Sequence, residues 1–173
     1  METLPNLRSF NLSQGFYLFQ PADFSRLLPV LGHAPLRELV LFFGTSSTVE
    51  GPPTAGLSGL EKLSIHWCLY DNQREPGSSS THLYNLIRPS LTTLVELRIT
   101  RLPEQLLVNF DLRLLQPAGD TLRVLQWFVP NHDESILDIV PEILPNLVTL
   151  KIEWSNRFGW QSALWKVCIF YST

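Results

Sequence analysis

One short pattern, L-x-x-L-x-L, recurs six times along the chain and constrains its fold more than any other feature. Its apolar positions are Leu7, Phe10 and Leu12; Leu36, Leu39 and Leu41; Leu60, Leu63 and Ile65; Leu94, Leu97 and Ile99; Leu122, Leu125 and Trp127; and Leu147, Leu150 and Ile152. The first residues of successive copies are 29, 24, 34, 28 and 25 positions apart. Self-similarity at a period of roughly 20–50 residues indicates a repeat architecture, in which each unit buries its apolar side chains against its neighbours.

A second repeated sequence supports this alignment of the six copies. Leu144-Pro145-Asn146-Leu147 repeats Leu4-Pro5-Asn6-Leu7 letter for letter, and each tetrapeptide ends on the first leucine of a copy. The copies at the two ends of the series therefore begin at equivalent positions.

Each copy of the pattern predicts a strand with one buried face. Successive side chains of a strand point to opposite faces, so the second and third apolar residues point inward and the residues around them point outward. Stacked parallel strands then form three outward lanes, each containing one residue per copy. The first lane is Ser9, Glu38, Lys62, Glu96, Val124 and Thr149; the second is Asn11, Val40, Ser64, Arg98, Gln126 and Lys151; the third is Ser13, Phe42, His66, Thr100, Phe128 and Glu153. Glu38, Lys62 and Glu96 alternate in sign, which predicts lateral ion pairs worth about 0.2–1 kcal/mol each.

The segments between the strands contain two predicted helices with clear apolar spacing. Residues 21–31 carry apolar residues at helical spacing, with Pro29 expected to shorten or kink the helix. Residues 133–144 carry an apolar face and two acidic residues at their start, and Pro141 should disturb the last turn.

The other connections are short or ambiguous. Residues 44–59 and 71–81 are rich in Gly, Pro and Ser and predict loops, and residues 82–88 predict a short helix. Residues 103–115 fit either a helix or an alternating strand. We favour a helix, because Pro103 followed by an acidic residue suits a first helical turn and because parallel strands need a crossover between them.

Composition limits the class of protein. With 45% hydrophobic and 17% charged residues, the chain can bury a core as a single domain. Its net charge of −3 makes nucleic acid an unexpected partner. No apolar run approaches the ~18 residues of a membrane-spanning helix, and the start lacks the features of a signal peptide. We therefore expect no membrane association and an intracellular location, cytoplasmic or nuclear.

No pattern of catalytic or metal-binding residues is present. The sequence lacks the glycine-rich phosphate loops and the G-x-S-x-G serine motif. His33, His66, His82 and His132 are scattered without the spacing of zinc ligands, and Cys68 is best interpreted as a buried small residue. We expect no enzyme, cofactor or metal, and a hydrolase that uses a scattered Ser, His and Asp is a remote alternative.

The third lane contains the candidate binding residues. Phe42 and Phe128 are large apolar side chains at outward positions, where aromatic residues commonly anchor an interface. His66, Thr100 and, in the neighbouring lane, Arg98 lie between them. These five residues predict a protein-binding site; the alternative is that neighbouring loops fold over the two rings.

The six patterns resemble leucine-rich repeats, over about residues 4–155. Such repeats imply an α/β solenoid, curved, with a parallel sheet on the concave face and irregular helices and loops on the convex face. The positions three beyond each pattern are Gly15, Gly44, Cys68, Leu102, Pro130 and Ser155, none of them Asn. Ile65-His66-Trp67-Cys68 resembles the cysteine-containing intracellular subtype, and the irregular period and Leu-Pro-Asn-Leu openings look like the repeats of fungal F-box proteins.

This resemblance divides the chain into a repeat domain of about six repeats, residues 1–155, and an aromatic tail or cap of unknown structure, residues 156–173. It implies a protein–protein interaction module similar to the substrate-recognition arm of an F-box type ubiquitin ligase adaptor. No F-box helices precede Leu4, so we expect no direct docking to the ligase adaptor. The alternative is a structural or non-functional fragment of a longer repeat protein.

Overall fold

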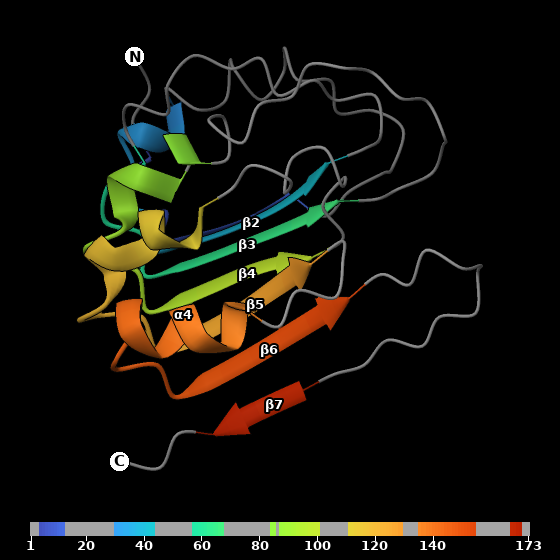
Figure 1. Ribbon diagram of the computed structural model, residues 1–173. Coiled ribbons are helices and arrows are strands. Elements are labelled where there is room, and N and C mark those ends of the chain that lie inside the picture. Colours follow the sequence, from blue (N-terminus) through green and yellow to red (C-terminus); the bar gives the residue numbers. More distant parts are fainter. Residues whose placement is uncertain are drawn as a thin grey trace.

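The chain folds into a single seven-stranded sheet with helices on one face (Figure 1). The computed structural model describes residues 4–12, 30–43, 57–67, 84–85, 87–100, 111–129, 135–154 and 167–170. The strands are β1 (Ser9–Leu12), β2 (Glu38–Phe43), β3 (Lys62–Trp67), β4 (Glu96–Thr100), β5 (Val124–Val129), β6 (Thr149–Trp154) and β7 (Val167–Phe170). Strands β1 to β6 are parallel and β7 is antiparallel. The predicted α/β class is confirmed.

The strands lie in the order of the sequence, and their register matches the alignment of the six patterns. Leu39 pairs with Leu63, Leu63 with Leu97, and the same column continues through Leu125 to Leu150. The prediction that each pattern contains a strand is confirmed. Each strand begins two residues after the first leucine of its pattern.

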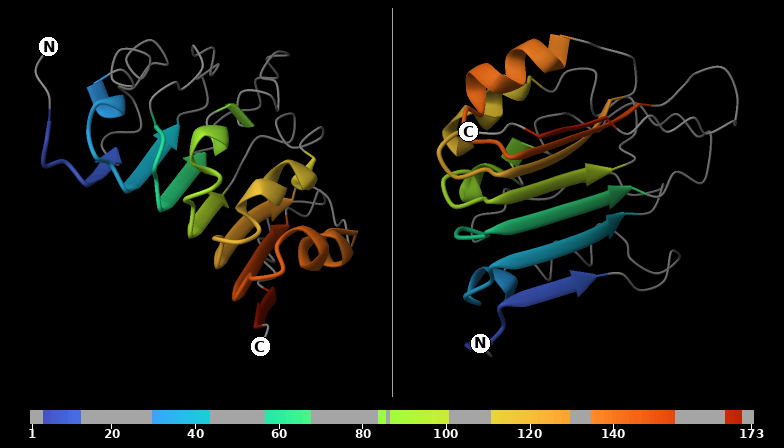
Figure 2. Two further views of the ribbon diagram at one scale, coloured as in Figure 1. Left: turned by 90° about the vertical axis from the view of Figure 1, so that its left-hand side faces the viewer. Right: turned by 90° about the horizontal axis from the view of Figure 1, so that it is seen from below.

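The core lies between the sheet and the helices. The inward residues of β2 to β6 are Leu39, Leu41, Leu63, Ile65, Leu97, Ile99, Leu125, Trp127, Leu150 and Ile152, and none is more than 4% exposed. At the β1 end, Leu7 and Phe10 are only partly buried against this core. The sheet curves, and its strands line the inner side while the helices lie outside (Figure 2).

Three helices whose full bounds are described cover the outer side. They are η1 (Arg88–Ser90) and η2 (Leu112–Ala118), both 3₁₀, and α4 (Ser135–Ile143). Helix α4 buries Ile136, Val140 and Ile143, as the spacing predicts, and continues through Pro141 to its end, so the disturbance expected there does not break it. Helix η2 confirms helical structure for residues 112–115 and contradicts the strand alternative there; residues 103–110 lie outside the described part.

Other predicted segments are described only in part. Val30, Leu31 and Gly32 are helical, so helical backbone is present after Pro29. Tyr84, Asn85 and Ile87 are also helical, as predicted for residues 82–88. The predicted loop at 44–59 is described only at residues 57–59, which are not in a helix or strand. The predicted loop at 71–81 lies outside the described residues.

The carboxyl-terminal segment contains a strand that the sequence did not predict. Strand β7 pairs with β6 from Thr149 opposite Phe170 to Ile152 opposite Val167. Residues 167–170 therefore cover the edge of the sheet that β6 would otherwise leave open (Figure 1).

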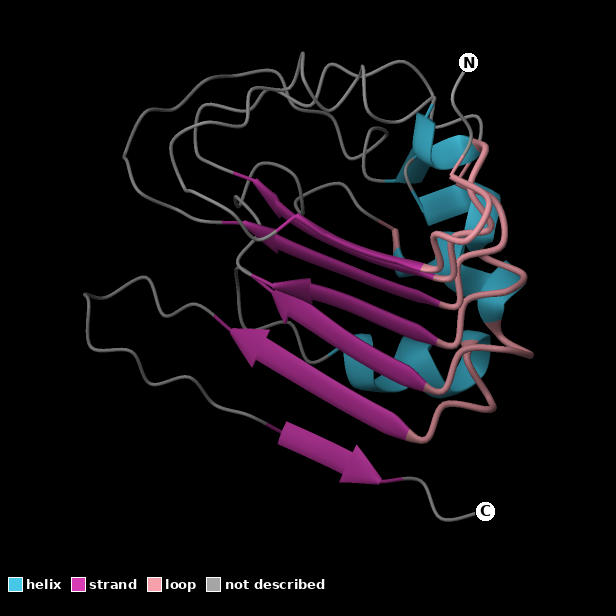
Figure 3. Cartoon of the chain, turned by 180° about the vertical axis from the view of Figure 1, so that it is seen from behind, coloured by secondary structure: helices cyan, strands magenta, loops and turns pink. Residues whose placement is uncertain are grey.

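The turns that lead into the strands are joined by a regular set of backbone hydrogen bonds. The carbonyl oxygen of Arg8 accepts from the amides of Arg37 and Glu38 at 2.8 and 3.0 Å. The same pair of bonds occurs at the next four junctions, with N···O distances of 2.7 to 3.1 Å; the acceptors are Arg37, Glu61, Val95 and Arg123. These turns stack along one edge of the sheet and fix the strand register (Figure 3).

Candidate functional site

The candidate site is the face of the sheet that points away from the helices, and the first two lanes lie on it as predicted. Ser9, Glu38, Lys62, Glu96, Val124 and Thr149 are lateral neighbours in register. The second lane is equally continuous, from Asn11 to Lys151. No described helix lies over this face (Figure 2).

The lateral ion pairs expected in the first lane do not form. Among the described residues, no ion pair joins Lys62 to Glu38 or Glu96. Instead Glu96 pairs with Arg98, two residues further along β4, and Glu38 accepts a hydrogen bond from the hydroxyl of Ser9 at 3.2 Å. Same-face residues two apart on one strand are close enough for long side chains to meet, and this arrangement leaves Lys62 exposed.

Three of the five predicted binding residues form one contact cluster, which we call the aromatic cluster: Phe42, His66 and Thr100. The rings of Phe42 and His66 are stacked, with centroids 4.6 Å apart and planes 18° apart. A hydrogen bond of 2.7 Å joins His66 Nδ1 to Thr100 Oγ1. Stacking and hydrogen bonding together hold the imidazole in one orientation across three strands.

The burial of this cluster corrects the expectation of fully exposed contact residues. Thr100 is only 8% exposed, so it supports His66 rather than offering a surface of its own. Phe42 and His66 are half-buried, and each therefore retains part of its surface. Arg98 lies beside the cluster with a side chain that is 47% exposed.

Phe128 is separated from the aromatic cluster by a break in the register. Its backbone pairs with Glu153 of β6, but the pairing of β4 with β5 ends at Arg98 opposite Gln126. The third lane is therefore not continuous from Thr100 to Phe128. The side chain of Phe128 lies outside the described part of the structure, so its prediction as an anchor is untested.

A polar cluster on β5 and β6 was missed as a site by the sequence analysis. Gln126 Nε2 donates to Glu153 Oε1 at 2.9 Å, and Lys151 Nζ lies 3.1 Å from the same oxygen. Gln126 and Glu153 are 9% and 8% exposed. Gln126 and Lys151 are neighbours in the second lane, with Glu153 two residues further along β6, so their positions were readable from the sequence although their burial was not.

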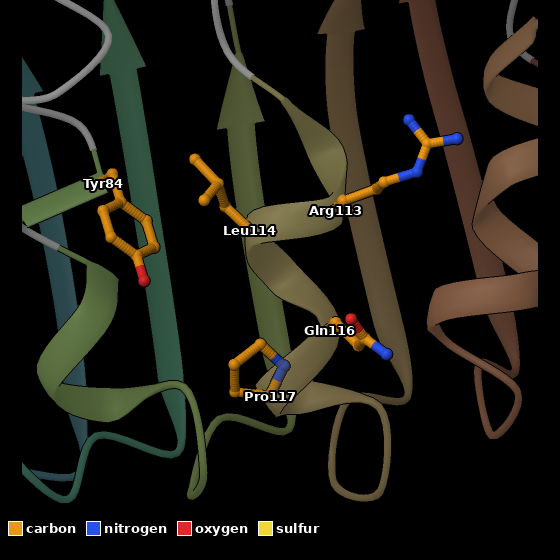
Figure 4. A pocket seen from close by; sticks show the side chains of 5 residues that line it. All are labelled: Tyr84, Arg113, Leu114, Gln116 and Pro117. Atoms are coloured by element: carbon orange, nitrogen blue, oxygen red, sulfur yellow. The ribbon is translucent and has the colours of Figure 1, made fainter.

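The opposite side of the molecule carries a shallow hollow of about 430 Å³. Tyr84, Leu114 and Pro117 face one another across it, while Arg113 and Gln116 extend from the far side of η2 (Figure 4). It contains no acid–base pair or nucleophile, so its chemistry is that of a weak apolar contact surface.

The described residues contain neither a group of metal ligands nor a membrane-spanning helix. There, no group of three or more His, Cys, Asp or Glu side chains is arranged to hold a metal ion. No helix within the described ranges has the length and apolarity needed to cross a membrane.

Comparison with known proteins gives no relative. The chain matches no protein-family model, no curated protein and no solved structure.

Proposed function

We propose that this chain is a protein-recognition module of the leucine-rich repeat type, and that it binds its partner on the sheet face that points away from the helices. The observation that carries the proposal is the aromatic cluster, in which a half-buried Phe42 is stacked on a His66 that Thr100 holds in place. A ring fixed before binding loses little conformational freedom when a partner covers it, which is the property of an interface anchor.

The repeat class is supported by three regularities that recur from unit to unit. The strands follow the sequence order, the inward leucines form continuous columns, and the same pair of turn hydrogen bonds occurs at five junctions. The curved sheet and the outer helices agree with the arrangement that the sequence resemblance implies.

The size and shape of the face favour a protein over a small molecule. Six parallel strands at about 4.8 Å spacing give a surface roughly 24 Å wide. Protein interfaces of ordinary size bury about 800 Å² on each partner, and a face of this width can form the central part of one. The shallow hollow at Tyr84 and Pro117 lies on the other side of the molecule.

The charges on the face favour a partner of mixed polarity. Glu96 is paired with Arg98, and Glu153 with Lys151, so most of the charge is neutralised within the face. This pattern does not offer the basic field that a phosphate backbone needs. It suits a protein surface that covers Phe42 and forms hydrogen bonds with Arg98 and Lys62.

Because its repeats resemble those of fungal F-box proteins, we propose that this module acts inside the cell in a manner similar to the substrate-recognition arm of a ubiquitin ligase. A structural fragment of a longer repeat protein is the second candidate. Both readings use the same sheet, and they differ in whether the face binds a specific partner.

Quantitative affinity capture with matched variants tests the proposal. Wild-type chain, Phe42→Ala and a control, Gln116→Ala, are immobilised, and the proteins that each retains from native cell extract are quantified. Gln116 is exposed and lies on η2, on the other side of the molecule. We expect Phe42→Ala to weaken capture of the specific partner by about 1–2 kcal/mol, which is roughly 5- to 30-fold, and Gln116→Ala to leave it unchanged.

Melting temperatures of the three proteins complete the experiment. Loss of capture by Phe42→Ala at an unchanged melting temperature supports a recognition role for the ring. Equal capture by all three proteins contradicts it, and so does capture that Gln116→Ala alone abolishes.

A further inference from the structure

The regular turn hydrogen bonds end at β1, where no described residue accepts from the equivalent donors. At every later junction the two amides that follow the first leucine donate to one carbonyl of the preceding turn; in the last unit, Val148 and Thr149 donate to Arg123 at 2.8 and 2.9 Å. Arg8 and Ser9 occupy the same positions in the first unit. Within the described part of the chain, no carbonyl accepts from their amides, because β1 has a neighbour on one side only.

In the last unit, a side-chain hydrogen-bond donor lies beside these two backbone amides. Asn146 directly precedes Leu147, and its Nδ2 donates to the carbonyl oxygen of Gly119 in the preceding unit at 3.4 Å. Asn6 occupies the equivalent position in the identical sequence Leu-Pro-Asn-Leu. Asn6 is exposed and makes no hydrogen bond to any described residue. The first unit thus presents two backbone donors and one side-chain donor in the arrangement that elsewhere binds a preceding unit.

The apolar surface beside these donors is also incomplete. Leu36 and Leu39 of the second unit are 4% and 0% exposed, whereas their equivalents Leu7 and Phe10 are only partly buried. Leu4 is 44% exposed. At this edge, the described residues therefore make neither the backbone hydrogen bonds nor the full apolar contacts that every later unit makes with its preceding unit.

We propose that the edge of β1 binds, in parallel, a strand that a partner protein contributes and that carries the L-x-x-L-x-L pattern. The carbonyl of the residue after the partner's first leucine accepts from the amides of Arg8 and Ser9. The carbonyl three residues before that leucine accepts from Asn6. The partner's inward apolar side chains cover Leu7 and Phe10, in the manner of β-strand addition.

A second copy of this chain fits the edge less well. Its own β6 is already paired with β7 across Thr149 to Ile152, so that edge is not available for β1. Two β1 strands related by a twofold axis run antiparallel, whereas the donors of Arg8, Ser9 and Asn6 repeat a parallel arrangement.

Binding of a synthetic peptide by the full chain tests the proposal. The probe is the fluorescently labelled segment Gly119–Val129 (GDTLRVLQWFV), because this segment contacts the second Leu-Pro-Asn-Leu sequence within the fold. The control peptide carries Leu125→Asp and Trp127→Asp, which removes the inward apolar contacts. Fluorescence anisotropy should show saturable binding of the probe and at least tenfold weaker binding of the control.

Three protein variants locate the bound peptide. Ser9→Pro removes the outward amide at an edge position where proline is tolerated, and Ser9→Ala is its matched control because it keeps the amide. We expect at least tenfold weaker binding for Ser9→Pro, wild-type binding for Ser9→Ala and roughly threefold weaker binding for Asn6→Ala. If Ser9→Pro fails to fold, Asn6→Ala decides the question.

Several results overturn the proposal. They are the absence of saturable binding, equal binding of probe and control peptides, and wild-type binding by both folded Ser9→Pro and Asn6→Ala. A chain that dimerises through Ser9 in sedimentation experiments but does not bind the peptide would assign the edge to a second copy instead. The capture experiment with Phe42→Ala is independent of all these outcomes.

Discussion

Leu97 and Arg98 are adjacent in the sequence and lie in opposite environments. Leu97 is fully buried in the column of inward leucines, whereas the side chain of Arg98 is 47% exposed on the candidate face. The alternation of a strand produces this contrast, since a shift of one residue would exchange the two faces. The pair therefore reports directly on whether the faces are assigned correctly.

Truncation of these two residues should have very different effects on stability. Leu97→Ala leaves a cavity in a packed column and should lower the free energy of unfolding by roughly 2–5 kcal/mol. Arg98→Ala removes an ion pair whose arginine side chain is 47% exposed, and should cost less than about 1 kcal/mol. Chemical denaturation of both variants measures the difference, and equal destabilisation would show that the register is wrong.

The sequence predicted the face to which each strand side chain points better than it predicted how deeply the side chain is buried. The inward positions follow from a period of two, so Leu39 and Ile152 could be assigned without a structure. The burial of Thr100 could not, because it depends on the side-chain orientation of His66 on the next strand. The pairing of Glu96 with Arg98 was missed for the same reason: two neighbours competed for one carboxylate, and sequence does not rank them.

At the scale of elements, polar residues just before the first leucines connect neighbouring turns. Thr93 Oγ1 donates to the carbonyl oxygen of Leu60 at 2.8 Å, and Thr121 Oγ1 to that of Leu91 at 3.5 Å. Asn146 makes the equivalent contact with Gly119. These bonds satisfy turn carbonyls that the strand ladder does not reach.

Removal of one such hydroxyl should weaken the junction between two units. Thr93→Val keeps the shape of the side chain and loses the bond to Leu60, so we expect a loss of about 0.5–1.5 kcal/mol in the free energy of unfolding. Thr92→Val is the matched control, since Thr92 is exposed and adjacent. Thermal and denaturant unfolding measure the stability of both variants. Equal stability of Thr93→Val and Thr92→Val would mean that the Thr93 bond does not stabilise the turn.

The elements that the sequence predicted are those with a strong apolar period. Helix α4 and the six parallel strands fall into this group, because each buries a regular face. The 3₁₀ form of η2 was not predicted, since Pro117 and short turns decide it locally. Strand β7 was missed because an edge strand needs only backbone pairing, so residues 167–170 carry no repeat pattern.

At the scale of the whole molecule, the two ends of the sheet differ. Strand β7 covers the edge of β6, while β1 has no described neighbour on its outer side. The sequence analysis left residues 156–173 as a tail or cap of unknown structure, and residues 167–170 cover the carboxyl-terminal edge of the sheet as β7. Local opening should therefore be easiest at β1.

Hydrogen exchange should follow this asymmetry. Amides of β3, β4 and β5 lie between paired strands and should exchange slowest, β1 should exchange fastest, and β6 should be protected by β7. Mass spectrometry of peptic fragments measures these rates. Fast exchange in β6 equal to that in β1 would contradict the pairing of β7, and uniform protection would contradict the open β1 edge.

Site-specific photocrosslinking tests most directly whether the sheet face is the recognition surface. A benzophenone amino acid is placed at Arg98, beside the aromatic cluster, or at Gln116, on the other side of the molecule, and each protein is irradiated in native cell extract. We expect one discrete protein to be crosslinked from position 98, Phe42→Ala in the same chain to suppress the product, and position 116 not to give it. A discrete product from position 116 alone, insensitive to Phe42→Ala, would show that the sheet face is not the recognition surface.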